Sequence, residues 1–156
     1  MRRSARHAAS LLLLAIAATP APARADDLAD VLAANHAFDQ ALSHRDMRAL
    51  DALWAHDADV TCIHPSGRAL LVGWEAVRKS WAEGTFRRFG EMNVTMADPH
   101  VRIHGTVAVV VGVEAVRAKR ADDGQAVEFQ ALTTNTYEKR DGRWLMTHHH
   151  ASRAAR

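Results

Sequence analysis

The chain has 156 residues and a formal charge of +2, which favours one domain without a strong charge bias. Its single cysteine excludes a framework of intrachain disulfides. Residues 1–25 hold four arginines and no acid, so the remainder has 16 basic and 18 acidic side chains, a formal charge of −2. After residue 25 no run of Lys or Arg exceeds two residues, which argues against a nucleic-acid-binding protein.

Residues 1–25 have the pattern of a secretory signal peptide. Three arginines precede an apolar run over residues 11–18, and Ala-Arg-Ala at residues 23–25 is a small-x-small cleavage sequence. The apolar run is too short to span a bilayer comfortably. We therefore expect cleavage after Ala25, a periplasmic or secreted protein of residues 26–156, and no membrane association after cleavage.

The first part of that protein is predicted to be helical. Residues 28–44 place apolar side chains at steps of three and four, as in an amphipathic helix. Asp46 is a suitable N-cap for a second helix that extends to about Ala55. A third helix is expected from Trp74 to about Glu83, with Gly84 as its stop signal.

The remaining elements are predicted strands. Alternating, β-branched residues indicate a strand over 58–64, in which Cys62 is expected to be buried, followed by a short return strand over 68–72. Four longer strands are expected over residues 93–104, 106–120, 126–139 and 143–152, with hairpin loops at 122–124 and 141–142 and a bulge or sheet edge at Pro99. Helices on one face of an antiparallel sheet give an α+β fold. We expect a cone-shaped, curved sheet wrapped around three N-terminal helices, with a pocket between them.

Three stretches of the chain carry a family resemblance: residues 41–60 (ALSHRDM, then LWAHDADV), residues 73–77 (GWEAV) and residues 135–152 (NTYEKRDGRWL, then HHHAS). Together they resemble the nuclear transport factor 2-like superfamily, in particular its SnoaL-like branch. The last hairpin also resembles the association domain of calcium/calmodulin-dependent kinase II. The resemblance covers residues 28–152 and implies a cystatin-like roll that commonly forms a homodimer. Members include isomerases, cyclases, dehydratases, transport factors and assembly domains, so the fold does not fix the function.

The final hairpin allows a prediction of which side chains face the pocket. A two-residue loop at Asp141-Gly142 places Asn135 opposite His148 and Thr133 opposite His150. We expect these side chains and Tyr137 to point into the cone and His149 to point away. An error of one residue in the register would reverse this assignment.

His64 stands at the end of the first predicted strand, directly before Pro65. The resemblance suggests that it takes the place of the catalytic Asp of the ketosteroid isomerases, and an imidazole is a suitable general base near neutral pH. The position that matches the isomerases' tyrosine is Phe38, which has no hydroxyl group. Steroid isomerisation is therefore not expected.

The leading interpretation is a domain that binds a small, largely apolar organic ligand, without a cofactor. Turnover, if present, would be acid/base chemistry of the isomerase, cyclase or dehydratase type. His64 would be the base, and His148, His150 and Asn135 would orient or polarise the substrate. Further ligand contacts are expected from Trp54, Trp74, Trp81, Tyr137 and Arg117, although Arg117 also suits a solvated charge at a strand end.

Two alternatives remain open at this point. The first is a non-catalytic dimeric binding or assembly module in which the histidines form a structural network. The second is a metal site formed by His64, His148 and His150, with Glu114 as a candidate for orienting a ring. The resemblance implies that a homodimer would use the outer face of the sheet, and Val110, Val116, Leu132 and Leu145, expected to be exposed there, are compatible with that.

Overall fold

The computed structural model describes residues 25–67 and 69–155. The predicted signal peptide lies outside the described residues, apart from Ala25. Within those ranges no helix is both long enough and apolar enough to cross a membrane.

The helices follow the predicted order. α1 spans Ala25–His44 and α2 spans Met47–Leu53, with the Asp46 side chain accepting a hydrogen bond from Ala49 N at 3.0 Å. A third helical stretch contains α3 (Trp74–Lys79), the π-helical turn η1 (Ser80–Thr85) and α4 (Phe86–Arg88). The predicted stop at Gly84 is wrong, because the π-helical turn carries the chain through that residue and the helix ends at Arg88.

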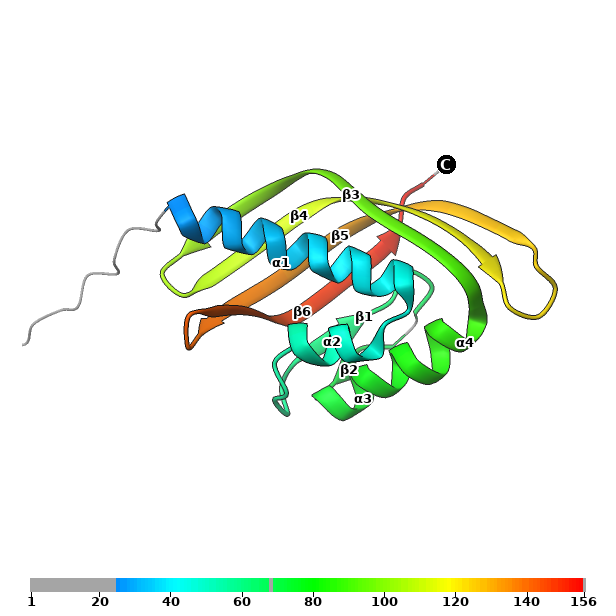
Figure 1. The fold of residues 1–156 in the computed structure, drawn as a ribbon, viewed down its shortest axis with the longest axis horizontal. Helices are drawn as coiled ribbons and strands as arrows, with labels where there is room; N and C mark the ends of the chain where they lie inside the picture. The colour runs from blue at the N-terminus through cyan, green and yellow to red at the C-terminus, as the bar shows by residue number, and fades with distance from the viewer. Residues whose placement is uncertain (1–24, 68, 156) are drawn as a thin grey trace, which may run out of the picture.

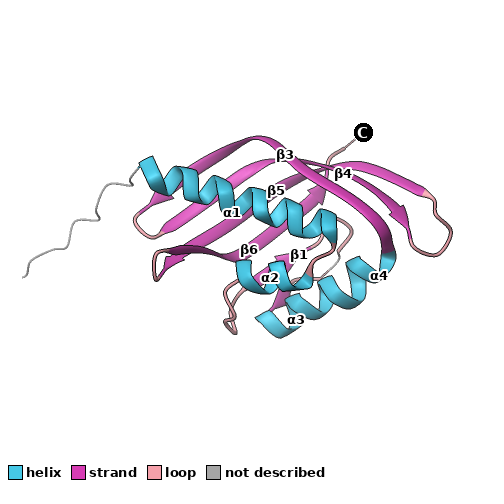
Figure 2. Cartoon of the chain, in the orientation of Figure 1, coloured by secondary structure: helices cyan, strands magenta, loops and turns pink. Residues whose placement is uncertain are grey.

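Six strands form one sheet with the order β2-β1-β6-β5-β4-β3. The strands are β1 (Thr61–Ile63), β2 (Leu71–Val72), β3 (Phe89–His104), β4 (Val107–Arg120), β5 (Ala126–Arg140) and β6 (Arg143–Arg153). All neighbours are antiparallel except β1 and β6, which are parallel. Figures 1 and 2 show a curved sheet with α1 lying across one face of the long strands and the shorter helices gathered near β1 and β2. The predicted α+β cone is confirmed.

The core lies between α1 and the inner face of the sheet. Phe38, Leu50 and Met146 are fully buried there, and Cys62 is buried as predicted. Polar side chains of α1 also fix the helix to β3: Met96 N donates to Asp39 Oδ2 at 2.9 Å. Val94 N likewise donates to Ser43 Oγ at 2.9 Å. The position of α1 over the sheet is thus set by hydrogen bonds as well as by apolar packing.

Two irregularities in the sheet decide which side chains point inward. β3 shifts register between Ala97 and His100, which confirms the bulge expected around Pro99. β6 shifts as well: Tyr137 pairs with Met146, but Thr136 pairs with His148, so Thr147 is an extra residue. Beyond it the alternation is reversed, and His149 rather than its neighbours faces the core.

The predicted outer face is also partly wrong. Val110 and Val116 are buried on the inner side of β4, whereas Leu132 is exposed and Leu145 is half-buried. The outer face of β4 instead carries Val111 and Val113, which are more than 40 % exposed.

Candidate functional site

A cavity of about 590 Å³ opens between the inner face of the sheet and the helical stretch of residues 74–88. Its apolar lining includes Leu42, Leu71, Trp81, Val94, Val116 and Phe129. Its polar lining includes His64, Ser80, Glu114 and His149. A largely apolar cavity of this size, with a few convergent polar groups, suits one small organic molecule.

His64 enters this cavity because it continues the inward alternation of Val60 and Cys62. Its Nε2 lies 2.8 Å from Ser80 Oγ, and Ser80 Oγ donates to the Val77 carbonyl at 2.6 Å. A hydroxyl group has one proton, so the proton between His64 and Ser80 belongs to Nε2. The lone pair of the neutral ring is therefore on Nδ1, which makes no hydrogen bond with any residue that the structure describes.

The surroundings of His64 favour the uncharged ring. Burial lowers the pKa of His64 to about 4. The ring packs edge-on against Trp81, with 4.3 Å between the ring centroids. At neutral pH His64 is thus an uncharged imidazole with a free lone pair.

His149 lies beside it and is held by a buried network. Its side chain is 1 % exposed, and its Nδ1 lies 2.8 Å from Asn135 Oδ1. Asn135 Nδ2 and the Tyr137 hydroxyl both donate to Asn35 Oδ1, at 2.8 and 3.0 Å. Burial first, and the nearby His64 next, lower the pKa of His149 to about 3. His149 is therefore a neutral, rigidly oriented ring in the cavity wall.

Glu114 is the third titratable group of the cavity. Its side chain is 2 % exposed, and Oε1 has no hydrogen-bond partner among the described residues. Burial, together with the charge of Asp39, raises the pKa of Glu114 to about 8, and the neighbouring Thr133 hydroxyl opposes this shift. Glu114 is therefore mostly protonated at neutral pH and can donate a proton. Burial likewise raises the pKa of Asp39 to about 6.

The predicted inward facing of His148 and His150 is wrong. The extra residue at Thr147 places both rings on the outer face, where His148 Nδ1 lies 2.6 Å from Thr61 Oγ1. The predicted metal group of these two residues with His64 is wrong for the same reason, since His64 faces the cavity. Within the described ranges, no cluster of three or more His, Cys, Asp or Glu side chains is arranged to hold a metal ion.

The other predicted ligand contacts are divided between several places. Trp81 lines the cavity, whereas Trp54 and Tyr137 are buried in the core outside its lining. Trp74 lines a separate surface depression, in which His56 stacks on it with 4.8 Å between the ring centroids. Arg117 is exposed on the outer face, 3.6 Å from Glu128, and does not reach the cavity. Asn135 is buried behind His149 rather than in the cavity lining.

The sequence predicts the wrong face for His149 and gives Glu114 only a candidate role in orienting a metal-bound ring. One signal pointed to Glu114: it is a lone acid within the apolar run of residues 107–116. A charged residue inside such a run is either on the solvent face or in a site. No comparable signal marked His149, because Thr147 does not stand out as a bulge residue.

The family model of the SnoaL-like domain matches residues 31–156. The F-box protein SKIP8 of Arabidopsis thaliana is 30 % identical over 122 residues, which is 78 % of this chain and 48 % of that protein. The chain thus spans about half the length of this relative, and 18 % of the calcium/calmodulin-dependent protein kinase type II of Caenorhabditis briggsae.

Two solved structures are similar in both sequence and fold. A candidate dehydratase of the nuclear transport factor 2-like family from Streptomyces avermitilis is 27 % identical, with a TM-score of 0.75, covering 88 % of this chain and all of that one. A candidate association domain of calcium/calmodulin-dependent protein kinase type II from Thiobacillus denitrificans is 31 % identical, with a TM-score of 0.63, covering 80 % of this chain and 94 % of that one.

Proposed function

Because the chain belongs to the SnoaL-like domain family, we propose that its cavity binds a small, largely apolar organic molecule and catalyses an elimination, as a lyase of the dehydratase type. The observation that carries this proposal is the pairing of an unprotonated imidazole with a protonated carboxyl group in one cavity, at His64 and Glu114. The similarity to the candidate dehydratase supports the reaction class.

In this reaction His64 is the general base and Glu114 the general acid. His64 Nδ1 takes a proton from a carbon atom of the substrate, and the electron pair of that C–H bond forms a carbon–carbon double bond. The bond from the adjacent carbon to a hydroxyl group breaks, and Glu114 donates its proton to the leaving oxygen, which departs as water. The imidazolium then loses its proton to solvent and the carboxylate regains one, so that both groups return to their starting states.

The remaining lining residues have supporting roles in this proposal. Trp81 contacts the apolar part of the substrate, and His149 offers its second ring nitrogen to a polar group. Asn135 acts through His149, because its amide oxygen lies 2.8 Å from His149 Nδ1. We further propose that residues 1–25 direct export and are removed.

A second candidate function is assembly through the outer face of the sheet without turnover. It is favoured by the 31 % identity to the candidate association domain from Thiobacillus denitrificans. In that case the histidine network is structural, and a second copy of the chain covers Val111, Val113 and Leu132. The two functions are compatible with each other, because they use opposite faces of the sheet.

Ligand retention by the purified protein tests the cavity. The untagged protein would be analysed by native mass spectrometry and for metal content, alongside two variants. Gly84→Phe fills the cavity, because Gly84 lines it and a Cβ there meets no atom within 4 Å. Ala115→Phe is the control, since Ala115 lies on the outer alternation of β4.

We expect an organic molecule bound to the parent protein and to Ala115→Phe, and lost from Gly84→Phe. A chain that is empty in all three forms, and whose stability is unchanged by His64→Ala, would support the assembly function instead. Stoichiometric zinc or copper would contradict the elimination mechanism.

A further inference from the structure

The mouth of the cavity carries a concentration of positive charge. Arg88 at the end of α4, Arg120 at the end of β4 and Arg153 at the end of β6 all line it. Among the described residues of the lining, Glu114 is the only acid, and burial keeps it protonated at neutral pH. The cavity is therefore positive in a protein whose residues 26–156 have a formal charge of −2.

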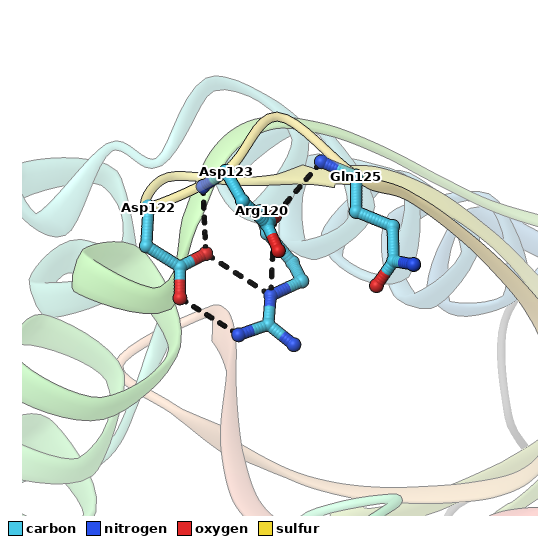
Figure 3. A network of polar contacts seen from close by, with 4 residues as sticks. All are labelled: Arg120, Asp122, Asp123 and Gln125. Atoms are coloured by element: carbon cyan, nitrogen blue, oxygen red, sulfur yellow. Dashed lines mark hydrogen bonds and ion pairs between the residues drawn. The ribbon is translucent and has the colours of Figure 1, made fainter.

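Arg120 is already neutralised by its own hairpin (Figure 3). Its Nε and Nη2 donate to the two carboxylate oxygens of Asp122, at 3.0 and 2.7 Å, and Asp123 lies 3.4 Å from Nε. Gln125 N in turn donates to Asp123 Oδ1 at 2.9 Å, which closes the loop between β4 and β5. We therefore assign Arg120 to the stability of the hairpin.

Arg88 and Arg153 are different, because neither has a carboxylate partner within the described chain. Each guanidinium instead lies near an aromatic ring: Arg153 Cζ is 4.3 Å from the centre of Phe129, and Arg88 Cζ is 5.9 Å from the centre of Phe89. A stacked guanidinium uses its face for the ring and keeps its N–H edge for a planar acceptor. A carboxylate matches such an edge with two parallel hydrogen bonds.

We propose that the ligand is an organic carboxylate, whose acid group binds Arg153 and Arg88 at the mouth while its apolar body extends to His64 and Glu114. This inference rests on the proposed function, because it names the substrate class of the same cavity. The division of the lining supports it: cations stand at the mouth, and the body of the cavity is apolar with uncharged polar groups.

Binding of a matched pair of probes tests the inference. The probes are 2-naphthoate and its uncharged counterpart 2-naphthamide, measured by calorimetry at low and high salt. We expect the naphthoate to bind about tenfold more tightly than the amide, as one charge-assisted hydrogen-bonded pair provides. This preference should shrink as salt screens the exposed arginines.

The double variant Arg88→Gln/Arg153→Gln should abolish the preference by weakening the binding of the naphthoate to the level of the amide. Arg117→Gln is the matched control on the outer face and should keep the preference. Arg153→Lys should retain part of the preference for the naphthoate. The positive charge remains in this variant, but the paired N–H donors of the guanidinium are lost. Circular dichroism would verify that each variant is folded.

The outcomes separate the two proposals. Equal affinity for both probes, unaffected by the double variant, would overturn the carboxylate assignment and leave a cavity that binds neutral apolar molecules. Absence of binding by either probe, in the parent protein and in Gly84→Phe alike, would overturn the cavity function together with its substrate class.

Discussion

At the scale of single residues, burial controls the protonation of the candidate site. It raises the pKa of Glu114 to about 8 and lowers that of His64 to about 4. Both side chains are uncharged between these limits, since the low-dielectric interior disfavours the charged form of either group. The pair is thus prepared to exchange protons with a substrate without first holding a buried charge.

The first prediction concerns the pH dependence of turnover. Below pH 4 His64 becomes protonated and cannot accept a proton, and above pH 8 Glu114 loses the proton that it must donate. The kcat/KM for the ligand identified by mass spectrometry should therefore be bell-shaped with limbs near these values. Glu114→Gln should lower kcat by about 10²- to 10⁴-fold. A profile without an alkaline limb would exclude Glu114 as the acid.

The second prediction concerns stability. The pKa of Glu114 rises from 4.5 in the unfolded chain to about 8 in the fold, so the folded state binds its proton more tightly. The stabilisation is complete below pH 4.5 and is lost as the pH rises through 8. The free energy of unfolding, measured with urea, should change less between pH 4.5 and pH 8 for Glu114→Gln than for the parent protein. The stability of the variant relative to the parent protein should therefore increase towards pH 8. If the free energy of unfolding changed with pH as steeply in Glu114→Gln as in the parent protein, the raised pKa of the buried Glu114 would be contradicted.

The buried histidines have the opposite sign. Their pKa values fall from 6.5 to about 4 for His64 and about 3 for His149. The folded state therefore binds fewer protons than the unfolded chain, and stability is lost as the pH falls from 6.5 through these values. The loss of stability below pH 6.5 should therefore be the same in Glu114→Gln as in the parent protein. This shared loss is an internal reference for the experiment.

At the scale of secondary-structure elements, η1 brings Ser80, Trp81, Gly84 and Thr85 to the cavity. Such π-helical turns are rare and occur often at functional sites. Gly84 does not have a positive φ, and there is open space at its Cβ position. Gly84→Ala should therefore stabilise the protein by about 0.4–1 kcal/mol, through reduced freedom of the unfolded chain.

Thermal and urea unfolding would measure this effect. Gly142→Ala is the matched control and should destabilise the protein, because Gly142 has φ of +79° in the final hairpin loop. Destabilisation by Gly84→Ala equal to that of the control would mean that η1 requires glycine for a reason other than its dihedral angles.

The order and approximate bounds of the elements could be predicted from sequence, because hydrophobic periodicity and turn residues are local signals. The facing of side chains could not. Both faces of β4 are apolar, so alternation alone does not distinguish the buried Val110 from the exposed Val111. In β6 the single extra residue at Thr147 exchanged the roles of the three consecutive histidines. The inward position of His64, the proposed base, could be predicted, because β1 is regular up to the residues that precede Pro65, and His64 does line the cavity.

At the scale of the whole molecule, part of the outer face of the sheet is apolar. Val111, Val113 and Leu132 are 45 %, 41 % and 55 % exposed, and Val113 pairs directly with Leu132. Contiguous apolar patches of this kind mark interaction surfaces. A homodimer that buries this patch is the expected form of the protein.

Light scattering after size exclusion tests that expectation. The parent protein should have the mass of a dimer, and Leu132→Glu should have the mass of a monomer, because a buried unpaired charge opposes association. Leu70→Glu is the control, since Leu70 is 58 % exposed but lies outside the strands. A monomeric parent protein, or a dimeric Leu132→Glu, would locate the interface elsewhere or remove it.

The parallel pairing of β1 with β6 has a consequence for how the protein folds. Thr61 pairs with His148 and Ile63 pairs with His150, so the strand that presents His64 depends on the C-terminal strand. Contacts so distant in sequence form slowly, because a long loop must close first. During synthesis β1 is therefore expected to pair with β6 only after residues 148–150 have left the ribosome. We therefore expect His64, the proposed base, to reach its position in the cavity only late in folding, after β6 has formed.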